Sequence, residues 1–196
     1  GATCVVIPPA WGKTKETLLP LAETILATFR EAGEPVTVLR YDGIRRRGES
    51  HNDPECRIPG YENLHYTFSQ GAEDVQTTLD FLESSPGLRP RTVILVTFSV
   101  ASIEARRAIA SEQRGRIGGW ISVVGSSDPQ SLMRVISGGI DYFGGADRGV
   151  RFGFQDVQGM LLDIDRAASD AIARGIAFLD DARRDLEKLL GELDLE

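Results

Sequence analysis

Residues 91–101 read RTVILVTFSVA and contain the clearest strand pattern of the chain. Thr92 to Phe98 show no alternation of polar and apolar side chains, so a strand here is apolar on both faces. Such strands are typical of the centre of a parallel sheet, which helices cover on both sides. The segment therefore predicts a central strand of an α/β protein, with Ser99 directly after it and a helix over 102–111.

Strand and helix patterns alternate on both sides of this segment. Short apolar runs predict further strands over 4–7, 36–41, 117–124 and 175–179. Apolar residues at helical spacing predict helices over 14–32, 70–83, 157–173 and 181–195, and Asp128-Pro129 predicts the start of another. Thr14 and Ser69 are the expected N-terminal caps of the first two helices. This order predicts one domain over 1–196, a three-layer α/β sandwich with a mostly parallel sheet.

The composition limits the classes of function. A net charge of −7 disfavours a nucleic-acid surface, which needs a basic stripe. No run of eighteen apolar residues predicts a membrane span, and the first residues lack the pattern of a signal peptide. Two cysteines, Cys4 and Cys56, are too few for a disulfide framework, which favours the cytoplasm. The cysteines and the two histidines show no metal-ligand spacing, and no glycine-rich phosphate loop follows a strand, so neither a metal nor a cofactor is expected.

Ser99 is the strongest candidate for a reactive group. In a nucleophile elbow, a serine on a sharp strand-to-helix turn has small residues two positions before and after it. Here those positions hold Thr97 and Ala101 instead of two glycines. The alternative is that Ser99 only caps the following helix. Its place directly after the central strand favours the elbow.

The loop after the first strand, Pro8 to Lys13, is the second candidate. An elbow serine needs backbone N–H donors that hold the negative oxygen of a tetrahedral intermediate. The N–H groups of Ala10, Trp11 and Val100 are the expected donors of this oxyanion hole. The alternative is a Pro/Gly turn whose aromatic residue packs over the edge of the sheet. The triple arginine Arg45-Arg46-Arg47 is interpreted as a solvated turn, or as an anion-attracting group if it lies beside a site.

The chain resembles the acyltransferase (thioesterase) family of bacterial bioluminescence and related serine α/β hydrolases. The resemblance covers about residues 2–179 and runs through the segments VVIPPAWGKTKETLLPLAETI, VLRYDGIRRRGES, SQGAEDVQTTLDFL, RTVILVTFSVASIEARRAIA and ISVVGSSDPQSLMRVISGGIDYF. It implies an α/β-hydrolase-like fold and an ester or thioester substrate, fatty-acyl or similar, free or carrier-bound. It also implies that Ser99 is the nucleophile, beneath a cap or lid of about 129–170.

The chain departs from this family at the other two members of the triad. The family's acid follows a late strand, which makes Asp180 or Asp181 the expected acid. No histidine follows it, because His51 and His65 both precede Ser99. Three explanations remain open: a missing C-terminal segment carries the histidine, His51 or, less favoured, His65 has been recruited as the base, or the site is degenerate. The sequence thus predicts a serine acyl hydrolase or acyltransferase, with a non-catalytic hydrolase-like binding domain as the alternative.

Overall fold

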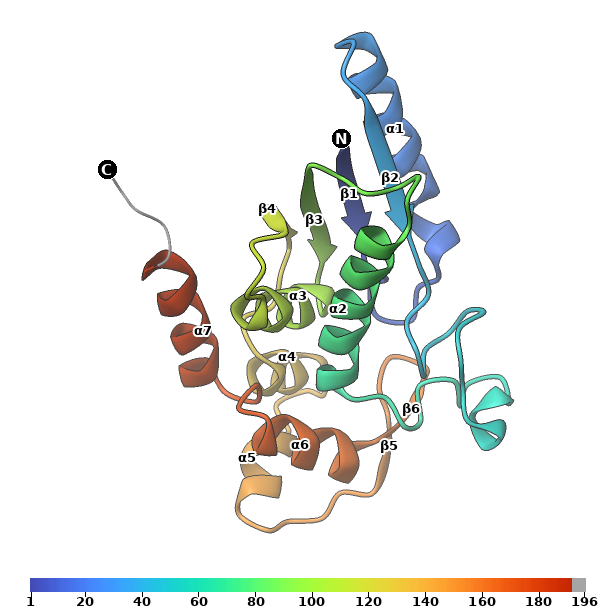
Figure 1. Cartoon of the computed structure of the whole chain (residues 1–196). Helices are drawn as coiled ribbons and strands as arrows, with labels where there is room; N and C mark the ends of the chain where they lie inside the picture. The colour runs from blue at the N-terminus through green and yellow to red at the C-terminus, as the bar shows by residue number, and fades with distance from the viewer. Residues whose placement is uncertain (192–196) are drawn as a thin grey trace.

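A computed structural model describes residues 1–191 of the chain. Its main sheet has four parallel strands in the order β2-β1-β3-β4 (Figure 1). The strands are β1 (Thr3–Ile7), β2 (Val36–Arg40), β3 (Thr92–Phe98) and β4 (Ile117–Val123). The predicted α/β class and parallel sheet are confirmed, and β3, which is predicted to be central, has strands on both sides.

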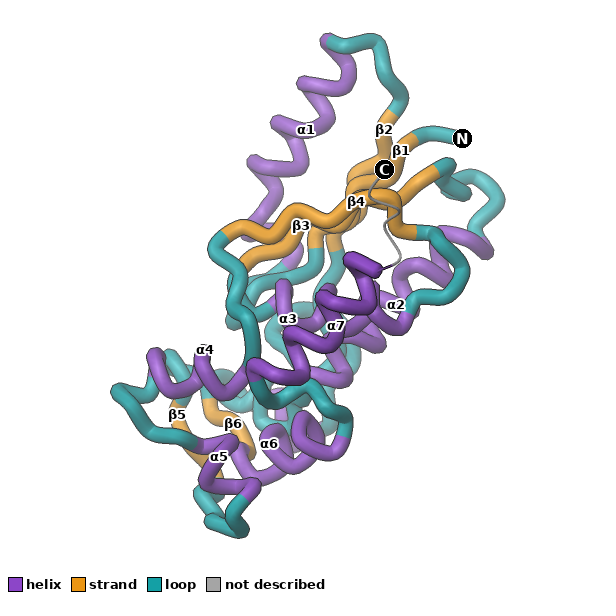
Figure 2. Tube along the Cα trace, turned by 90° about the vertical axis from the view of Figure 1, so that its left-hand side faces the viewer, coloured by secondary structure: helices purple, strands orange, loops and turns teal. Residues whose placement is uncertain are grey.

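Helices cover both faces of the sheet, as the apolar strands require. On one face lies α1 (Leu19–Glu31), which packs against Val5, Ile7 and Val96. The other face carries α2 (Phe68–Ser84) and α3 (Ala101–Ser111), with α7 (Leu179–Gly191) packed on α3 (Figure 2). The three predicted layers are therefore present.

A second core lies beyond the carboxyl ends of the strands, below the sheet in Figure 1. It is built from α4 (Pro129–Ile136), α5 (Tyr142–Asp147), a small antiparallel hairpin and α6 (Ile164–Ala173). The hairpin strands are β5 (Phe154–Asp156) and β6 (Leu161–Asp163). Phe68 and Val100 are buried in this second core, so it packs directly against the elements that flank Ser99.

Two predicted elements near the end of the chain are wrong. The range predicted as a helix over 157–173 begins with the β5–β6 turn, and only α6 is helical. The range predicted as a strand over 175–179 is a bend followed by the first residue of α7. Gly175 ends α6 with a positive φ of 61°, and the Ala177 carbonyl accepts the Gln130 N–H at 3.1 Å. The apolar residues of this segment are buried among helices. Burial there requires the same short apolar run as burial in a sheet, so the sequence pattern does not separate the two.

The two predicted caps also differ from those observed. Thr14 makes no capping bond, because the chain enters α1 through a 3₁₀ turn, Lys15–Leu18. Thr67 caps α2 by accepting the Gln70 N–H, while the Ser69 hydroxyl donates to Asp170 at 2.6 Å. In contrast, Asp128 caps α4 as predicted, since its carboxylate accepts the Ser131 N–H at 2.7 Å.

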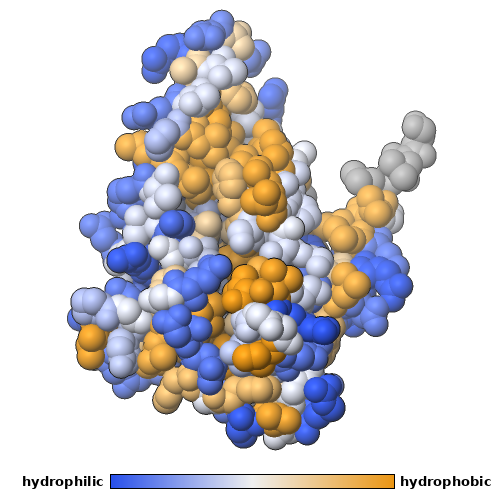
Figure 3. Space-filling model, turned by 180° about the vertical axis from the view of Figure 1, so that it is seen from behind, coloured by the Kyte–Doolittle hydropathy of each residue, from blue (hydrophilic) through white to orange (hydrophobic). Residues whose placement is uncertain are grey.

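Strand β4 forms an edge of the sheet. Its residues Ile121 and Val123 pair with Val96 and Phe98 of β3. Paired residues point to the same side of a sheet, so Ile121 and Val123 are on the side on which α1 packs against the other strands. Ile121 is 53% exposed, so α1 does not reach this end of the sheet. Apolar side chains gather on the side of the molecule seen from behind (Figure 3). Among the described helices, none is long and apolar enough to cross a bilayer.

Candidate active site

Ser99 occupies the sharp turn between β3 and α3. Its φ is +52°, in the left-handed region that costs an L-residue about 1–2 kcal/mol. The N-cap position of α3 is Val100, and no side chain caps this helix, so the capping alternative for Ser99 is not realised. Strained backbone of this kind is often found at functional sites, where the surroundings hold it in place.

A group of hydroxyls, two of them on buried residues, holds this turn. The Thr97 and Ser102 hydroxyls lie 3.0 Å apart, one at the end of β3 and the other at the start of α3. Trp120 donates its indole N–H to Thr97 at 2.9 Å, and Ser122 donates to Ser102 at 2.8 Å. These bonds link β4 to both ends of the turn. They satisfy buried polar groups and fix the direction in which the chain passes Ser99.

Ser99 lines a cavity of about 50 Å³. The other lining residues come from the loop after β1, from α2, from the start of α3, from α4 and from the β5–β6 hairpin: Trp11, Phe68, Val100, Leu132, Met133, Ile136, Val157, Gln158 and Leu162. Among these residues none carries an acid, an amine or an imidazole. Since a water molecule needs about 10–15 Å³, the cavity holds only a few water-sized groups.

Of the predicted oxyanion-hole residues, Trp11 and Val100 line the Ser99 cavity, and Ala10 is not among its lining residues. Trp11 is part of the cavity wall, and its indole N–H donates to the Val157 carbonyl at 3.3 Å. The Ala10 carbonyl accepts the Lys13 N–H at 3.1 Å, which closes a tight turn after β1. Val100 begins α3, and the first N–H groups of a helix have no carbonyl acceptor within that helix.

A buried ion pair supports the loop after β1. Arg46 donates to the Pro9 carbonyl at 3.0 Å, and its guanidinium lies 4.6 Å from the centre of the Tyr66 ring. Its charge is paired with Glu104, which also accepts the Tyr66 hydroxyl. Arg46 and Glu104 are both buried, so the interpretation of this arginine as part of a solvated turn is wrong. Its partner lies 58 positions away, which leaves no local sequence signal for the pair.

Both histidines lie outside the group of residues that lines the Ser99 cavity. The His51 side chain is 64% exposed, and its Nε2 lies 3.9 Å from an oxygen of Asp53. His65 contacts the same Asp53 and also Glu55. The long loop between β2 and α2 therefore brings the two histidines together around a carboxylate, and the recruitment of His51 as the base stays a prediction that no contact supports.

The expected acids lie in the first turn of α7. Asp181 accepts the Phe178 N–H at 3.0 Å and pairs with Arg184, which is the arrangement of a capping residue. Asp180 pairs with Arg183, and its side chain is 83% exposed. Neither contacts an imidazole in the described residues. The interpretation of Asp42 as a turn former is confirmed, since it accepts the backbone N–H groups of Lys15 and Glu49.

The loop between β2 and α2 contains one set of metal-ligating side chains that the sequence reasoning missed. One donor atom each from Asp53, Cys56 and His65 lies within 4.8 Å of the others. The sequence spacing gave no indication, because a 3₁₀ turn, Pro54–Arg57, and the following loop bring these residues together. A local signal was nevertheless present, since both histidines and one of the two cysteines fall between positions 51 and 65.

Comparisons with known proteins show the fold. No protein-family profile matches the chain, and no curated protein does. A solved structure of Est1E from Butyrivibrio proteoclasticus with ferulic acid bound has a TM-score of 0.64 and 14% identity, over 93% of this chain and 64% of that one. A structure of DcsB in complex with its substrate analogue has a TM-score of 0.52 and 21% identity, over 76% of this chain and 44% of that one.

These likenesses support the predicted hydrolase-like α/β fold. The chain spans less than two thirds of the length of either protein. The particular resemblance to the bioluminescence acyltransferases gains no support from them.

Proposed function

We propose that Ser99 accepts an acyl group from an ester or thioester. The observation that carries this proposal is the left-handed backbone of Ser99 at the end of the central strand, where the residue lines an apolar cavity. The cavity has Trp11 on one side and the start of α3, at Val100, on the other. The fold shared with Est1E, which was solved with a carboxylic acid bound, is consistent with this chemistry.

In the proposed reaction, the Ser99 oxygen attacks the carbonyl carbon of the ester. The electron pair of the carbonyl bond moves to its oxygen, which the N–H groups of Val100 and of the Ala10-Trp11 segment stabilise. When the carbonyl bond forms again, the alkoxide or thiolate leaves and takes up a proton. The serine proton passes to water, because no described residue that lines the cavity is a base.

Without a neighbouring base, the reaction is slow. Backbone donors and binding alone give about a thousand- to ten-thousand-fold acceleration over water in serine hydrolases that lack a triad member. We therefore expect acylation of Ser99 by activated esters and slow release of the acyl group. A base on a segment outside residues 1–191 would raise both rates.

The small cavity favours short acyl groups. Ligand pockets for drug-sized molecules measure about 300–1,000 Å³, far above the volume beside Ser99. Leu132, Met133 and Ile136 of α4 close it, together with the β5–β6 hairpin. These elements belong to the segment 129–170, to which we assign the role of a cap over the acyl group.

The test of the proposed function is covalent labelling by a fluorophosphonate, which reacts with nucleophilic serines. The wild-type chain is expected to take up one label, and Ser99→Ala to take up none. Ser126→Ala is the matched control: its backbone N–H donates to the Ser99 carbonyl at 3.4 Å, and the substitution keeps that N–H while removing a neighbouring hydroxyl. Labelling that survives in Ser99→Ala would disprove the proposal.

Enlarging the cavity is expected to change the preference for acyl length. Leu132→Ala removes part of the wall but leaves Met133 in the core. We expect the ratio of butyryl to acetyl p-nitrophenyl ester consumption to rise several-fold, because the longer acyl group then finds room. Stopped-flow release of p-nitrophenol measures both rates. An unchanged ratio would place the acyl group outside this cavity.

A second candidate function is a non-catalytic binding domain for a small apolar ligand. The specific observation in its favour is that the cavity wall is apolar and carries no titratable group among the described residues. This function predicts that the wild-type chain takes up no fluorophosphonate label, while a small apolar ligand still raises its melting temperature.

A further inference from the structure

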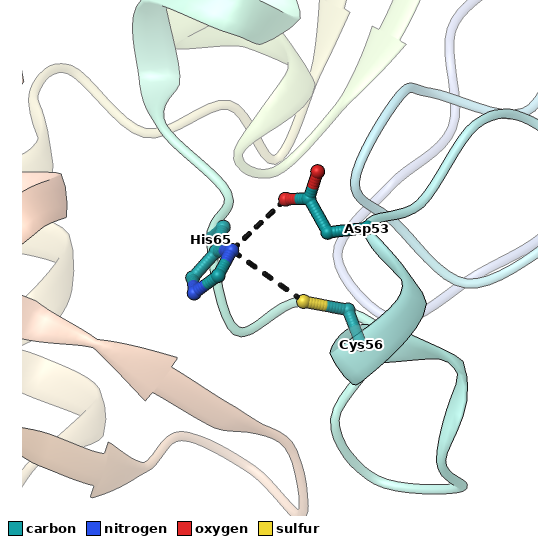
Figure 4. A group of neighbouring side chains, drawn as sticks. All are labelled: Asp53, Cys56 and His65. Atoms are coloured by element: carbon teal, nitrogen blue, oxygen red, sulfur yellow. Dashed lines mark hydrogen bonds and ion pairs between the residues drawn. The ribbon is translucent and has the colours of Figure 1, made fainter.

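Three donor atoms of different chemistry converge in the loop between β2 and α2. Asp53 Oδ2 lies 2.9 Å from His65 Nδ1, and Cys56 Sγ lies 3.7 Å from the same nitrogen (Figure 4). Cys56 is fully buried, while Asp53 and His65 are partly exposed. The donor atoms are a thiol, an imidazole and a carboxylate, which are the ligand types of protein zinc sites.

The geometry does not suit a catalytic cysteine. In a Cys–His–Asp relay, one ring nitrogen accepts from the thiol and the other donates to the carboxylate. Here both partners face Nδ1, as Figure 4 shows. A single ring nitrogen cannot pass a proton from one partner to the other. It can, however, share a bound cation with them.

Two of the three donor–donor distances are close to those of a tetrahedral metal site, and the third, between Cys56 Sγ and Asp53, is within 4.8 Å. With Zn–S of about 2.3 Å and Zn–N of about 2.0 Å, a sulfur and a nitrogen ligand lie about 3.5 Å apart. The distance between Cys56 Sγ and His65 Nδ1 is 3.7 Å. The hydrogen-bonded contact between Asp53 and His65, at 2.9 Å, has to lengthen by a few tenths of an ångström.

The other nitrogen of His65 has the partner that a metal-bound histidine needs. His65 Nε2 lies 3.2 Å from a carboxylate oxygen of Glu55. Histidines that bind a metal through one nitrogen usually donate the other N–H to a carboxylate, which sets the tautomer. Without a metal, both ring nitrogens face carboxylates, and Nδ1 donates to Asp53. A bound ion would replace the Nδ1 proton, while Glu55 would keep the Nε2 proton in place.

A fourth ligand is within reach. His51 Nε2 lies 3.9 Å from Asp53 Oδ1, and its exposed side chain is able to turn toward the site. The Arg45 N–H bonds to the His51 carbonyl at 2.8 Å, which closes the loop and holds His51 beside Asp53.

The charged groups in contact with the cluster match a divalent cation. Arg45 is the nearest positive group, with its Nε 3.3 Å from Asp53. Against it stand the carboxylates of Asp53 and Glu55 and, once deprotonated, the thiolate of Cys56. Three negative charges and one positive charge leave a net charge of −2. Arg45 can stay on Asp53, because a carboxylate has lone pairs for several partners.

We propose that Asp53, Cys56 and His65, with His51 as the fourth ligand, bind a zinc ion that braces this loop. On binding, the S–H bond of Cys56 and the Nδ1–H bond of His65 break, the sulfur and the nitrogen bond to zinc, and both protons pass to the buffer. His65 directly precedes Tyr66, whose ring lies 5.3 Å from that of Trp11 in the wall of the Ser99 cavity. The ion thus has a structural role, next to the proposed acyl site but independent of it.

The test uses the purified chain, freed of metal with a chelator and titrated with Co²⁺ and then Zn²⁺. We expect one cobalt ion per chain, with the visible bands of tetrahedral cobalt and a thiolate charge-transfer band in the near ultraviolet, and displacement by zinc. Cys56→Ser is expected to abolish the charge-transfer band and to weaken zinc binding more than about 100-fold, beyond the range of outer-shell changes. Glu55→Gln is expected to weaken it 10- to 100-fold.

The matched control is Cys4→Ala, which removes the other buried cysteine, in β1, and is expected to leave the cobalt spectrum unchanged. Ser99→Ala is expected to bind zinc as the wild type does, so the two proposals fail separately. Circular dichroism checks that Cys56→Ser is folded, and His65→Gln gives a second ligand variant. No stoichiometric binding by the wild type, or binding that Cys56→Ser and His65→Gln both retain, would overturn the zinc site.

Discussion

Glu104→Gln is expected to lower the free energy of unfolding by about 3–5 kcal/mol, because it leaves the buried guanidinium of Arg46 without its counter-charge. Glutamine has nearly the same shape as glutamate and still accepts a hydrogen bond from the Tyr66 hydroxyl. The loss therefore reports the missing charge and not a cavity. Urea unfolding followed by the fluorescence of Trp11 and Trp120 measures it.

The control for this prediction is an exposed ion pair. Glu83→Gln breaks the pair between Glu83 and Arg114, in which both side chains are exposed, and a longer contact with Arg116. It is expected to cost less than about 1 kcal/mol. A double variant, Arg46→Met with Glu104→Gln, is expected to lose less than the sum of the two single changes, because neither member of this ion pair is left buried without the other. A cost for Glu104→Gln as small as that for Glu83→Gln would contradict our description of the pair.

The same change is expected to slow the labelling of Ser99. Arg46 holds the Pro9 carbonyl, and Pro9 directly precedes the expected oxyanion donors Ala10 and Trp11. If Arg46 loses its partner, this loop loses its brace.

Asp74→Asn is expected to remove a contribution to stability that falls as the pH rises from 4 to 7. Burial raises the pKa of Asp74 from 3.8 to about 6, while the charge of Arg46 and the Ile44 N–H lower it less than burial raises it. A carboxyl group with a raised pKa in the folded state binds its proton more tightly there. Its contribution to stability is complete below pH 3.8 and is lost as the pH rises through about 6. The loss between pH 4 and pH 7 is about 2–3 kcal/mol.

Asp42→Asn is the matched control, because it changes a second buried aspartate with the opposite shift. Burial tends to raise the pKa of Asp42, but bonds from the N–H groups of Glu49 and Lys15 and the Lys15 ammonium lower it below the usual value. Its stabilisation is present above the unfolded pKa and is lost as the pH falls. Because the window for Asp42 lies below pH 3.8, urea unfolding from pH 4 to pH 7 is expected to show a changed slope for Asp74→Asn and a nearly unchanged slope for Asp42→Asn. Equal slopes for wild type and Asp74→Asn would disprove the assignment.

Local sequence patterns were sufficient for most of the elements. β1 to β4 follow from short runs of β-branched and apolar residues, and α3 follows from the turn at Ser99. The β5–β6 hairpin did not follow, because Val157 and Leu162 belong to a helix-like apolar spacing that only the packing against α6 resolves. The run 175–179 has the composition of a buried strand but lies among helices, where burial produces the same composition.

The candidate site also has one part that the sequence predicts and another that only the structure shows. Ser99 could be found from the sequence, because a serine after a central strand depends only on residues next to it in the chain. The Arg46–Glu104 pair could not be found, because its members lie far apart in the chain. For Asp53, Cys56 and His65 the sequence shows only that they are neighbours in one loop, and the fold of that loop decides that their donor atoms meet.

By itself, therefore, the sequence determined the α/β class, the layers and the turn at Ser99, since hydrophobic periodicity and residue size act between neighbours in the chain. Only the tertiary structure decided which polar groups meet. Contacts such as that of Arg46 with Glu104, 58 positions apart, depend on how the loop folds over the sheet edge. No pattern among neighbouring residues predicts how this loop folds.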